Sequence, residues 1–340
     1  MGRCEALLPV GKVANEILLR YVFNKPVEDP SILLGPGLGE DAAVVRVGDS
    51  LLVLKSDPIT GAVENIGWLA VHINANDVAT RGAVPKWFLA TILLPENCEE
   101  QLLAKIFDQI SSALSELNAF LVGGHTEVCA GLNRPIVVGS MAGLVKGNKF
   151  FTSSGAKPGD AIVLTKTVGI EGTAVLASDY EQVLVKELGE DLVTKAKSMI
   201  KQISVVKDCL TAIEVEHVSA IHDLTEGGLI TALYELSEAS NVGFKVELSS
   251  VPIADVTLAV CEALKVNPYQ LVSSGAVLIT VEKSFVEELI SKLKEAGVKA
   301  TVIGEVVEKS SGRLFLMGGK PVELRVQQEE LWKVFKEYFR

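Results

Sequence analysis

The order of apolar and polar residues predicts alternating strands and helices in the first half of the chain. β-Branched runs on either side of the Gly-Asp-Ser turn at 48–50 are typical of a hairpin. Apolar residues at a spacing of three and four indicate amphipathic helices elsewhere. The predicted strands are 42–47, 51–54, 86–94, 135–144 and a short buried strand at 119–122. The predicted helices are 7–23, 66–80 and 99–117.

The second half follows the same alternation after an interruption at 150–160, where small residues, a proline and two glycines cluster. This segment is the predicted boundary between an N-terminal domain, 1–152, and a C-terminal domain, 153–340. Strands are predicted at 161–165, 220–222, 244–248, 276–281 and 299–306. Helices are predicted at 169–179, 192–213, 227–239, 254–264, 285–296 and 329–339. The expected fold class is therefore mixed α/β (α+β) with two domains.

The composition agrees with a folded chain of that size. The 340 residues are 48% hydrophobic and 22% charged, with a mean hydropathy of +0.34. The formal net charge of −11 and the pI of about 5.0 argue against nucleic-acid partners, because an acidic surface repels phosphate backbones. No apolar stretch has the length of a membrane span, and five scattered cysteines are typical of a reducing cytoplasm.

A glycine-rich segment at 35–39 resembles a phosphate-binding loop but fits neither common type. A Walker A loop requires Lys-Ser or Lys-Thr after its last glycine, and Glu40 and Asp41 stand there instead. A Rossmann fingerprint opens a helix, whereas this segment precedes a predicted strand. From composition alone, a simple turn is favoured by roughly two to one.

Acidic residues recur at the ends of predicted strands or in apolar surroundings, where an unpaired carboxylate is unfavourable. For any one of them, a helix cap or a surface ion pair is about equally good as an explanation. As a set, carboxylates that converge from several elements are typical of a site for Mg²⁺ and phosphate oxygens. The set comprises Asp41, Asp57, Asp77, Glu127, Asp223 and Glu226.

Asp77 belongs to a polar stripe on a predicted helix, together with Asn74 and Arg81. Such a stripe indicates either a solvated face or a face turned toward a site. Periodicity does not separate these two interpretations.

Six motifs together resemble the superfamily that contains AIR synthase, FGAM synthase, selenophosphate synthetase, thiamine-monophosphate kinase and the hydrogenase-maturation proteins HypE. Each motif is weak alone, but their order and separations across nearly the whole chain are specific. They are 39–45 (GEDAAVV), 56–57 (SD), 76–85 (NDVATRGAVP), 123–127 (GGHTE), 154–160 (SGAKPGD) and 222–228 (HDLTEGG). The loops GGHTE and DLTEGG are most similar to those of HypE.

The resemblance implies ATP in a cleft between two domains, with Mg²⁺ as cofactor, and an N-terminal domain that forms a homodimer through a shared β-barrel. It implies metal binding by Asp41, Asp57, Asp77 and Asp223. Nucleotide binding is implied for Gly37, Gly39, Asp41, Lys55, Asp77, Gly123, Gly124, Thr126 and Glu127. The candidate catalytic residues are Asp57, Asp223 and His125. Lys157 and His222 are weaker candidates for contacts to phosphate and for proton transfer.

HypE proteins end in a cysteine that accepts a carbamoyl group, whereas this sequence ends in Tyr338, Phe339 and Arg340. Thiocyanate chemistry of the HypE kind is therefore not expected. The expected activity is cytoplasmic, Mg-ATP-dependent phosphoryl transfer to an oxygen of a small-molecule or protein acceptor, with a maturation protein as a possible partner. Two alternatives stay open: a kinase of the thiamine-monophosphate kinase type, and a nucleotide-binding protein without turnover.

Overall fold

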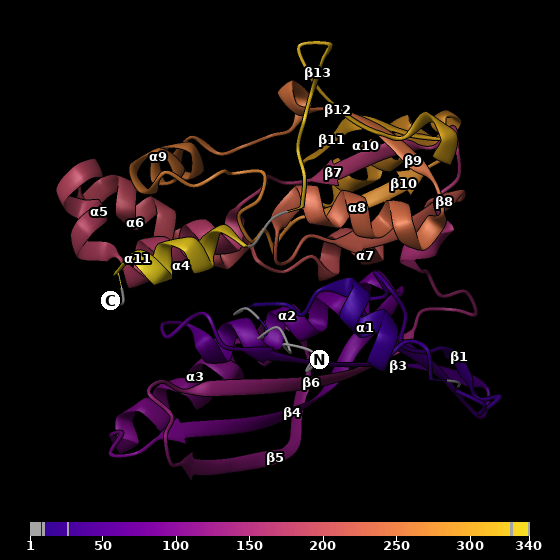
Figure 1. Cartoon of the computed structure of the whole chain (residues 1–340). Helices are drawn as coiled ribbons and strands as arrows, with labels where there is room; N and C mark the ends of the chain where they lie inside the picture. Colours follow the sequence, from indigo (N-terminus) through magenta and orange to yellow (C-terminus); the bar gives the residue numbers. More distant parts are fainter. Residues whose placement is uncertain (1–7, 9–10, 26, 327–328, 339–340) are drawn as a thin grey trace, which may run out of the picture.

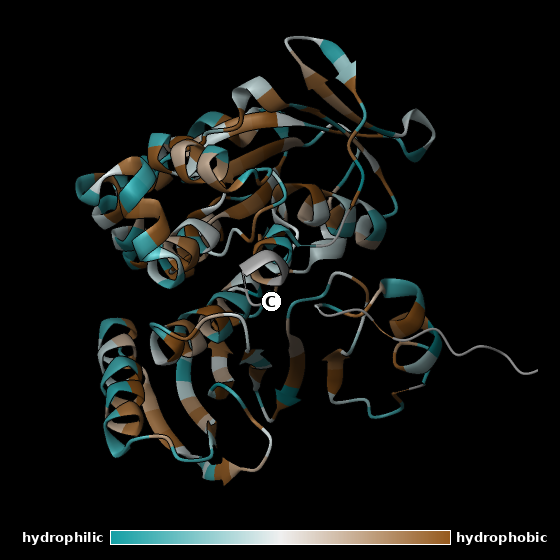
Figure 2. Cartoon of the chain, turned by 60° about the vertical axis from the view of Figure 1, so that its left-hand side comes forward, coloured by the Kyte–Doolittle hydropathy of each residue, from teal (hydrophilic) through white to brown (hydrophobic). Residues whose placement is uncertain are grey.

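The computed structural model describes residues 8, 11–25, 27–326 and 329–338 of the chain. Two β-sheets organise these residues, one in each half, and helices lie between them (Figure 1). Hydrophobic residues concentrate on the strands of both sheets (Figure 2). This arrangement confirms the prediction of a mixed α/β chain built from two halves that each contain strands and helices.

The first sheet has the order β1-β2-β3-β6-β4-β5 and is antiparallel except for the β4–β5 pair. The β2–β3 hairpin turns at 48–49 and pairs Val47 with Ser50, as its sequence predicts. The strands are β1 (Ile32–Leu34), β2 (Ala43–Val47), β3 (Ser50–Ile59), β4 (Ala83–Pro95), β5 (Phe120–Cys129) and β6 (Ile136–Val145).

Helices α2 (Ile66–Thr80) and α3 (Glu100–Leu117) lie on one face of this sheet, and α2 separates it from the second half (Figure 1). Nearly every residue of α2 is buried, because sheet, α3 and second half enclose it. Glycines permit this close packing. A Cβ on Gly139 of β6 would lie 2.4 Å from the Asn74 amide, and one on Gly67 would lie 2.4 Å from the Ile106 carbonyl.

The second sheet has the order β13-β12-β9-β11-β7-β10-β8. Its strands are β7 (Ala161–Thr165), β8 (Val218–Asp223), β9 (Gly243–Glu247), β10 (Val277–Val281), β11 (Ala300–Val307), β12 (Arg313–Met317) and β13 (Lys320–Val322). The helices of this half are α4 (Ile170–Asp179), α5 (Glu181–Leu188), α6 (Glu190–Ser198), α7 (Val206–Ala212), α8 (Gly228–Ser240), α9 (Asp255–Leu264), α10 (Val286–Glu295) and α11 (Glu330–Tyr338).

Three predictions about elements were wrong. The helix predicted at 7–23 is limited to α1 (Asn15–Tyr21), because 11–14 are not helical; 1–7 and 9–10 lie outside the described residues. The helix predicted at 192–213 is interrupted by the 3₁₀ turn Met199–Gln202 and the non-helical residues 203–205. The strand predicted as short and buried at 119–122 extends through the GGHTE motif to Cys129 and is exposed along nearly its whole length.

The first half contains one hydrophobic core beneath its sheet, and this core continues across α4, α5 and α11 of the second half. Further cores lie on the two faces of the second sheet. Among the described residues, no helix is both long and apolar enough to cross a membrane.

Candidate functional site

A cavity of about 640 Å³ lies between the two halves of the chain. Residues from both halves line it, which places the ends of β3, α2 and β8 around a single space. Its polar lining includes Lys12, Glu40, Asp41, Lys55, Asp57, Thr60, Asp77, Arg134, Glu171, Asp223, Thr225, Glu226, Glu235, Ser274 and Glu329.

Asp57 and Asp77 face each other across the Lys55 side chain. Asp57 lies within β3, which continues past it to Ile59, so the prediction that it ends a strand was wrong. The Lys55 Nζ is 2.7 Å from Asp77 Oδ2 and 3.1 Å from Asp57 Oδ2. Burial disfavours the charged amine, but Asp77 and Asp57 outweigh it and raise the pKa of Lys55. Lys55 therefore contacts two carboxylates here, where the family resemblance predicts that it contacts phosphates.

Asp77 is almost fully buried on α2, so its polar stripe faces the site and not the solvent. Burial raises the pKa of its carboxyl well above the ordinary range; Lys55 opposes this, and Asp223 and Asp57 add to it. Asn74, one turn earlier, accepts a hydrogen bond from the Asp57 backbone N–H at 2.8 Å and thereby ties α2 to β3.

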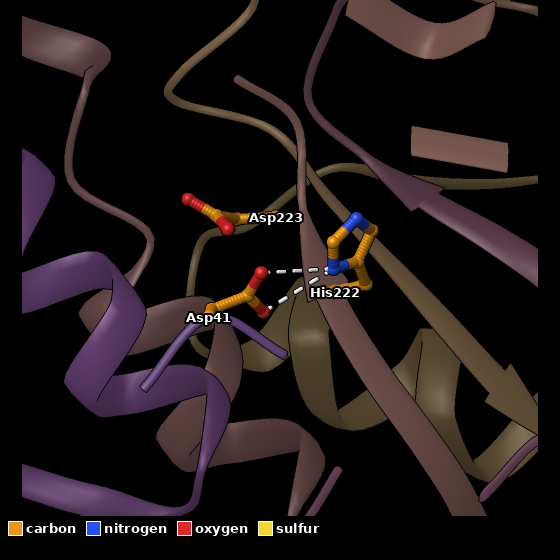
Figure 3. A group of neighbouring side chains, drawn as sticks. All are labelled: Asp41, His222 and Asp223. Carbon is orange, nitrogen blue, oxygen red and sulfur yellow. Dashed lines mark hydrogen bonds and ion pairs between the residues drawn. The ribbon is translucent and has the colours of Figure 1, made fainter. Parts of the chain in front are cut away.

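Asp41 is held between two cations. The guanidinium of Arg81 donates to its Oδ2 at 2.6 Å, and His222 Nδ1 lies 3.0 Å from its Oδ1 (Figure 3). Burial favours the neutral acid, yet His222 and Arg81 hold the pKa of Asp41 well below its usual range. Because this carboxylate is already neutralised, Asp41 is a weaker candidate for a metal ligand than Asp57 or Asp77, although the assignment stays a prediction.

His222 is buried between two carboxylates. Its Nε2 lies 3.3 Å from Glu235 Oε2, opposite Asp41, and Glu235 also accepts a hydrogen bond from Lys12 Nζ at 2.7 Å. Burial opposes protonation of the imidazole, but Asp41 and Glu235 raise the pKa of His222 to about 10. His222 is therefore a cation at neutral pH and positions Asp41; it cannot ligate a metal while protonated.

Asp223 ends β8 and points into the same space from the second half (Figure 3). Among the described residues its Oδ2 has no hydrogen-bond partner. Burial and the neighbouring Asp41 raise the pKa of Asp223 to about 6. An unpartnered buried carboxylate beside Asp57 and Asp77 is an incomplete set of oxygen ligands, which fits Mg²⁺ by charge and by ligand type.

Other predicted site residues divide into two groups. Gly37 and Gly39 line the cavity, and Gly39 has φ +73 and lies too close to the Glu235 carbonyl for a side chain to fit easily. The residues of GGHTE, namely Gly123, Gly124, His125, Thr126 and Glu127, lie on the exposed edge strand β5, outside the cavity. His125 is 3.4 Å from Glu127, and the exposed Lys157 also lies outside the cavity.

Five residues of the site were not predicted from the sequence as site residues: Lys12, Arg81, Glu171, Glu235 and Glu329. Arg81 carried a usable signal, because it belongs to the same helical stripe as Asp77. The other four lie on segments far apart in sequence, and no local pattern relates them.

Family models match both halves of the chain. The model described as AIR synthase related protein, N-terminal domain, matches residues 39–145, and the corresponding C-terminal domain model matches 157–317. The chain belongs to the AIR synthase related protein family. The resemblance that the six motifs predict is thereby confirmed.

Curated relatives of similar length fall on the hydrogenase-maturation side of this family. A putative hydrogenase expression/formation protein of Methanocaldococcus jannaschii is 29% identical, over 93% of this chain and 95% of the relative. The carbamoyl dehydratase HypE of Rhizobium leguminosarum bv. viciae is 27% identical, over 90% and 87% respectively.

Solved structures show the same two-domain fold. The HypE–HypF complex matches with a TM-score of 0.74 and 24% identity, over 91% of this chain and 99% of the other. HypE in complex with ATP matches with a TM-score of 0.68 and 21% identity, over 94% and 97%. AaThiL complexed with AMPPCP and TMP matches with a TM-score of 0.69 and 22% identity, over 86% and 92%.

Proposed function

We propose that this protein is an enzyme that binds Mg-ATP in the cavity between its halves and transfers the γ-phosphoryl group to an oxygen of an acceptor. The observation that carries the proposal is the convergence of Asp57, Asp77 and Asp223 from three elements on one buried space, with Asp223 Oδ2 left without a partner. The structures of relatives with ATP or AMPPCP support the nucleotide.

The Asp57, Asp77 and Asp223 carboxylates would hold the metal. Bound Mg²⁺ would supply charge neutralisation of the triphosphate. Lys55 is mounted between the first two carboxylates and is held as a cation. When the metal takes over those carboxylates, its ammonium is positioned to move toward a phosphate oxygen.

The glycine-rich segment 35–39 lies along the cavity wall, where Gly37 and Gly39 allow backbone N–H groups to approach a phosphate closely. Transfer then forms one bond between the acceptor oxygen and the γ-phosphorus and breaks the bond to the β,γ-bridging oxygen, so ADP leaves. The buried cavity favours this route over hydrolysis because its walls restrict water.

A homodimer through the first sheet is part of the proposal. Among the described strands, β5 pairs only with β4, so its outer edge is free, and Phe120, Leu121, Val122 and Val128 of β5 are all exposed. An exposed apolar edge of this length favours pairing with another strand. A second copy supplies that strand and would also cover the GGHTE residues, whose nucleotide role in this chain stays a prediction.

The HypE–HypF structure supports a maturation protein as a further partner, and the free thiols of Cys98, Cys129, Cys209 and Cys261 agree with a reducing cytoplasm. The AaThiL structure, whose ligands are AMPPCP and TMP, favours a small-molecule kinase as the second candidate. Both candidates use the same carboxylates and differ in the acceptor.

Nucleotide products test the proposal. Prolonged incubation with ATP should release ADP and phosphate slowly even with water as the acceptor, only when Mg²⁺ is present, and without AMP. AMP with pyrophosphate would show cleavage at the wrong bond. Tight Mg-ATP binding without any product, across water, thiamine phosphate and carboxylate acceptors, would favour the protein without turnover.

A further inference from the structure

We propose that the loops at 225–228 and 271–274 form a binding subsite for a carboxylate group of the acceptor, and that Glu329 of the same chain fills it in this structure. The inference rests on the proposed function, because it names the chemical class of the acceptor for the same cavity. It concerns the end of the cavity that the nucleotide ligands Asp57 and Asp77 do not occupy.

The Glu329 carboxylate is bound by backbone N–H groups from both loops. Its Oε2 accepts a hydrogen bond from the N–H of Gly227, and its Oε1 accepts one from the N–H of Val272 at 2.9 Å. Glu329 is only 6% exposed. Two neutral donors aimed at the two oxygens of one carboxylate form a binding site for a planar anion.

A helix cap accounts for only part of this arrangement. Glu329 Oε1 also accepts from the N–H of Leu331 at 3.2 Å, as a residue at the start of α11 commonly does. The contacts to Gly227 and Val272 come from other elements, the first from the start of α8, and capping does not require them. They persist as unsatisfied donors whenever Glu329 leaves, so another carboxylate is favoured in its place.

Partnerless polar groups beside the subsite are the second, independent observation. Among the described residues, Glu171 Oε2 and Ser274 Oγ are buried, line the same cavity and have no hydrogen-bond partner. Burying such groups without partners is unfavourable, so their presence on a cavity wall indicates a ligand that supplies the partners. An acceptor with a hydrogen-bond donor near its carboxylate satisfies them.

The position of the subsite agrees with acceptor binding. Gly227 follows Asp223 by four residues, so the two are at most about 14 Å apart along the chain. A small acceptor spans that separation and brings an oxygen toward the metal end. Glu329 is also a displaceable occupant, since burial and the nearby Glu226 raise its pKa to about 7, against the three backbone hydrogen bonds.

Displacement of Glu329 requires the chain end to move as a unit. Leu331 and Trp332 of α11 pack over Gly61 of the first half, and a Cβ on Gly61 would lie 3.4 Å from the Leu331 side chain. The segment from Glu329 onward thus spans the cavity from one half to the other. An acceptor that takes the subsite therefore competes with this segment.

Acetate is the probe that tests the subsite. In Glu329→Ala the two N–H groups lose their carboxylate, and sodium acetate should bind there about tenfold more tightly than in the wild type, because the internal competitor is absent. Acetate should then raise the melting temperature of Glu329→Ala above that in sodium chloride of equal concentration. Glu323→Ala, which removes an exposed carboxylate near the same chain end, is the matched control and should behave as the wild type.

Acetate that stabilises all three proteins equally, or no more than chloride, overturns the proposal and leaves Glu329 as a helix cap only. Inorganic phosphate that binds Glu329→Ala better than acetate overturns the assignment of a carboxylate. If Glu329→Ala does not fold, Glu329→Gln keeps the volume and the cap, and line broadening of the acetate NMR signal measures the affinity. Mg-ATP binding is measured on the same samples, so failure of the proposed function is seen separately.

Discussion

At the residue scale, Arg81 connects more of the site than any single acid does. Its guanidinium is fully buried at the end of α2, where it contacts Glu40 and Asp41 of the first half. It also donates to the Ser153 hydroxyl at 3.1 Å and to the Ile221 carbonyl at 3.3 Å. One side chain thus joins the segment beside the glycine-rich loop to the second sheet.

Replacing Arg81 should destabilise the protein strongly, because Glu40 and Asp41 would remain buried without a cation. We expect Arg81→Leu to lower the free energy of unfolding by about 3 to 5 kcal/mol. Urea denaturation measures this, with Arg46→Leu on the exposed part of β2 as the control. Equal midpoints for the two variants would show that the buried network is dispensable.

Glu171 gives a prediction about pH. Burial, with Glu226 and Asp223, raises its pKa from 4.5 to about 7, and Ser274 opposes the shift. A carboxyl whose pKa is higher in the folded state loses stabilisation as pH rises from the unfolded value to the folded one. The shift corresponds to at most about 3 kcal/mol.

Glu171→Gln should therefore be more stable than the wild type at pH 8 and nearly equal to it at pH 4. Melting temperatures in EDTA across that range measure the difference. Glu187→Gln, on the exposed side of α5, is the control. A difference that does not change with pH would contradict the raised pKa.

At the scale of elements, the position of α2 against the sheet determines the geometry of the carboxylates. The Asn74 side chain bonds the backbone of Asp57 on β3, and it lies where a Cβ on Gly139 of β6 would fall. A larger residue at 139 pushes α2 away from β3 and so separates Asp77 from Asp57.

Gly139→Ala should lower the free energy of unfolding by about 1 to 3 kcal/mol and weaken Mg-ATP binding as well. Gly35→Ala is the control, since its Cβ would meet the nearest atom at an ordinary 3.6 Å. Chemical denaturation and nucleotide titration measure the two effects. Normal nucleotide affinity in Gly139→Ala would show that the spacing of α2 and β3 is not important for the site.

Local pattern predicted much of this scale and failed where long-range contacts decide. The bounds of α2 were predicted correctly, because its apolar spacing is regular and Arg81-Gly82 ends it. Strand β5 was not, because the pattern at 119–122 indicates burial, while the position of β5 at the sheet edge exposes it. Asp77 was found from its apolar neighbours, whereas Glu329 requires knowledge of which loops it meets more than 50 residues away.

At the scale of the molecule, the first sheet presents an apolar outer region on β5 that a homodimer would cover. Val122→Lys places a charge in this region and should convert the dimer to a monomer. Val302→Lys, on an exposed position of β11 in the second sheet, is the control. Sedimentation at micromolar concentration measures the state, and a wild-type monomer would contradict the predicted dimer.

The two halves are both needed for the nucleotide site, because Asp57 and Asp77 come from the first and Asp223 from the second. Sequence motifs placed these acids in one site, but they did not show that Arg81 and His222 neutralise Asp41. The metal role predicted for Asp41 therefore needs the same measurement as those of the other carboxylates.

Calorimetric titration with a non-hydrolysable ATP analogue and Mg²⁺ tests the central claim most directly. The proteins are the wild type, Asp57→Asn, Asp77→Asn and the control Asp49→Asn, whose carboxylate is exposed in the β2–β3 turn. We predict Mg²⁺-dependent binding to the wild type and to Asp49→Asn, and its loss in Asp57→Asn and Asp77→Asn with the fold retained. Undiminished affinity in both site variants would contradict the account.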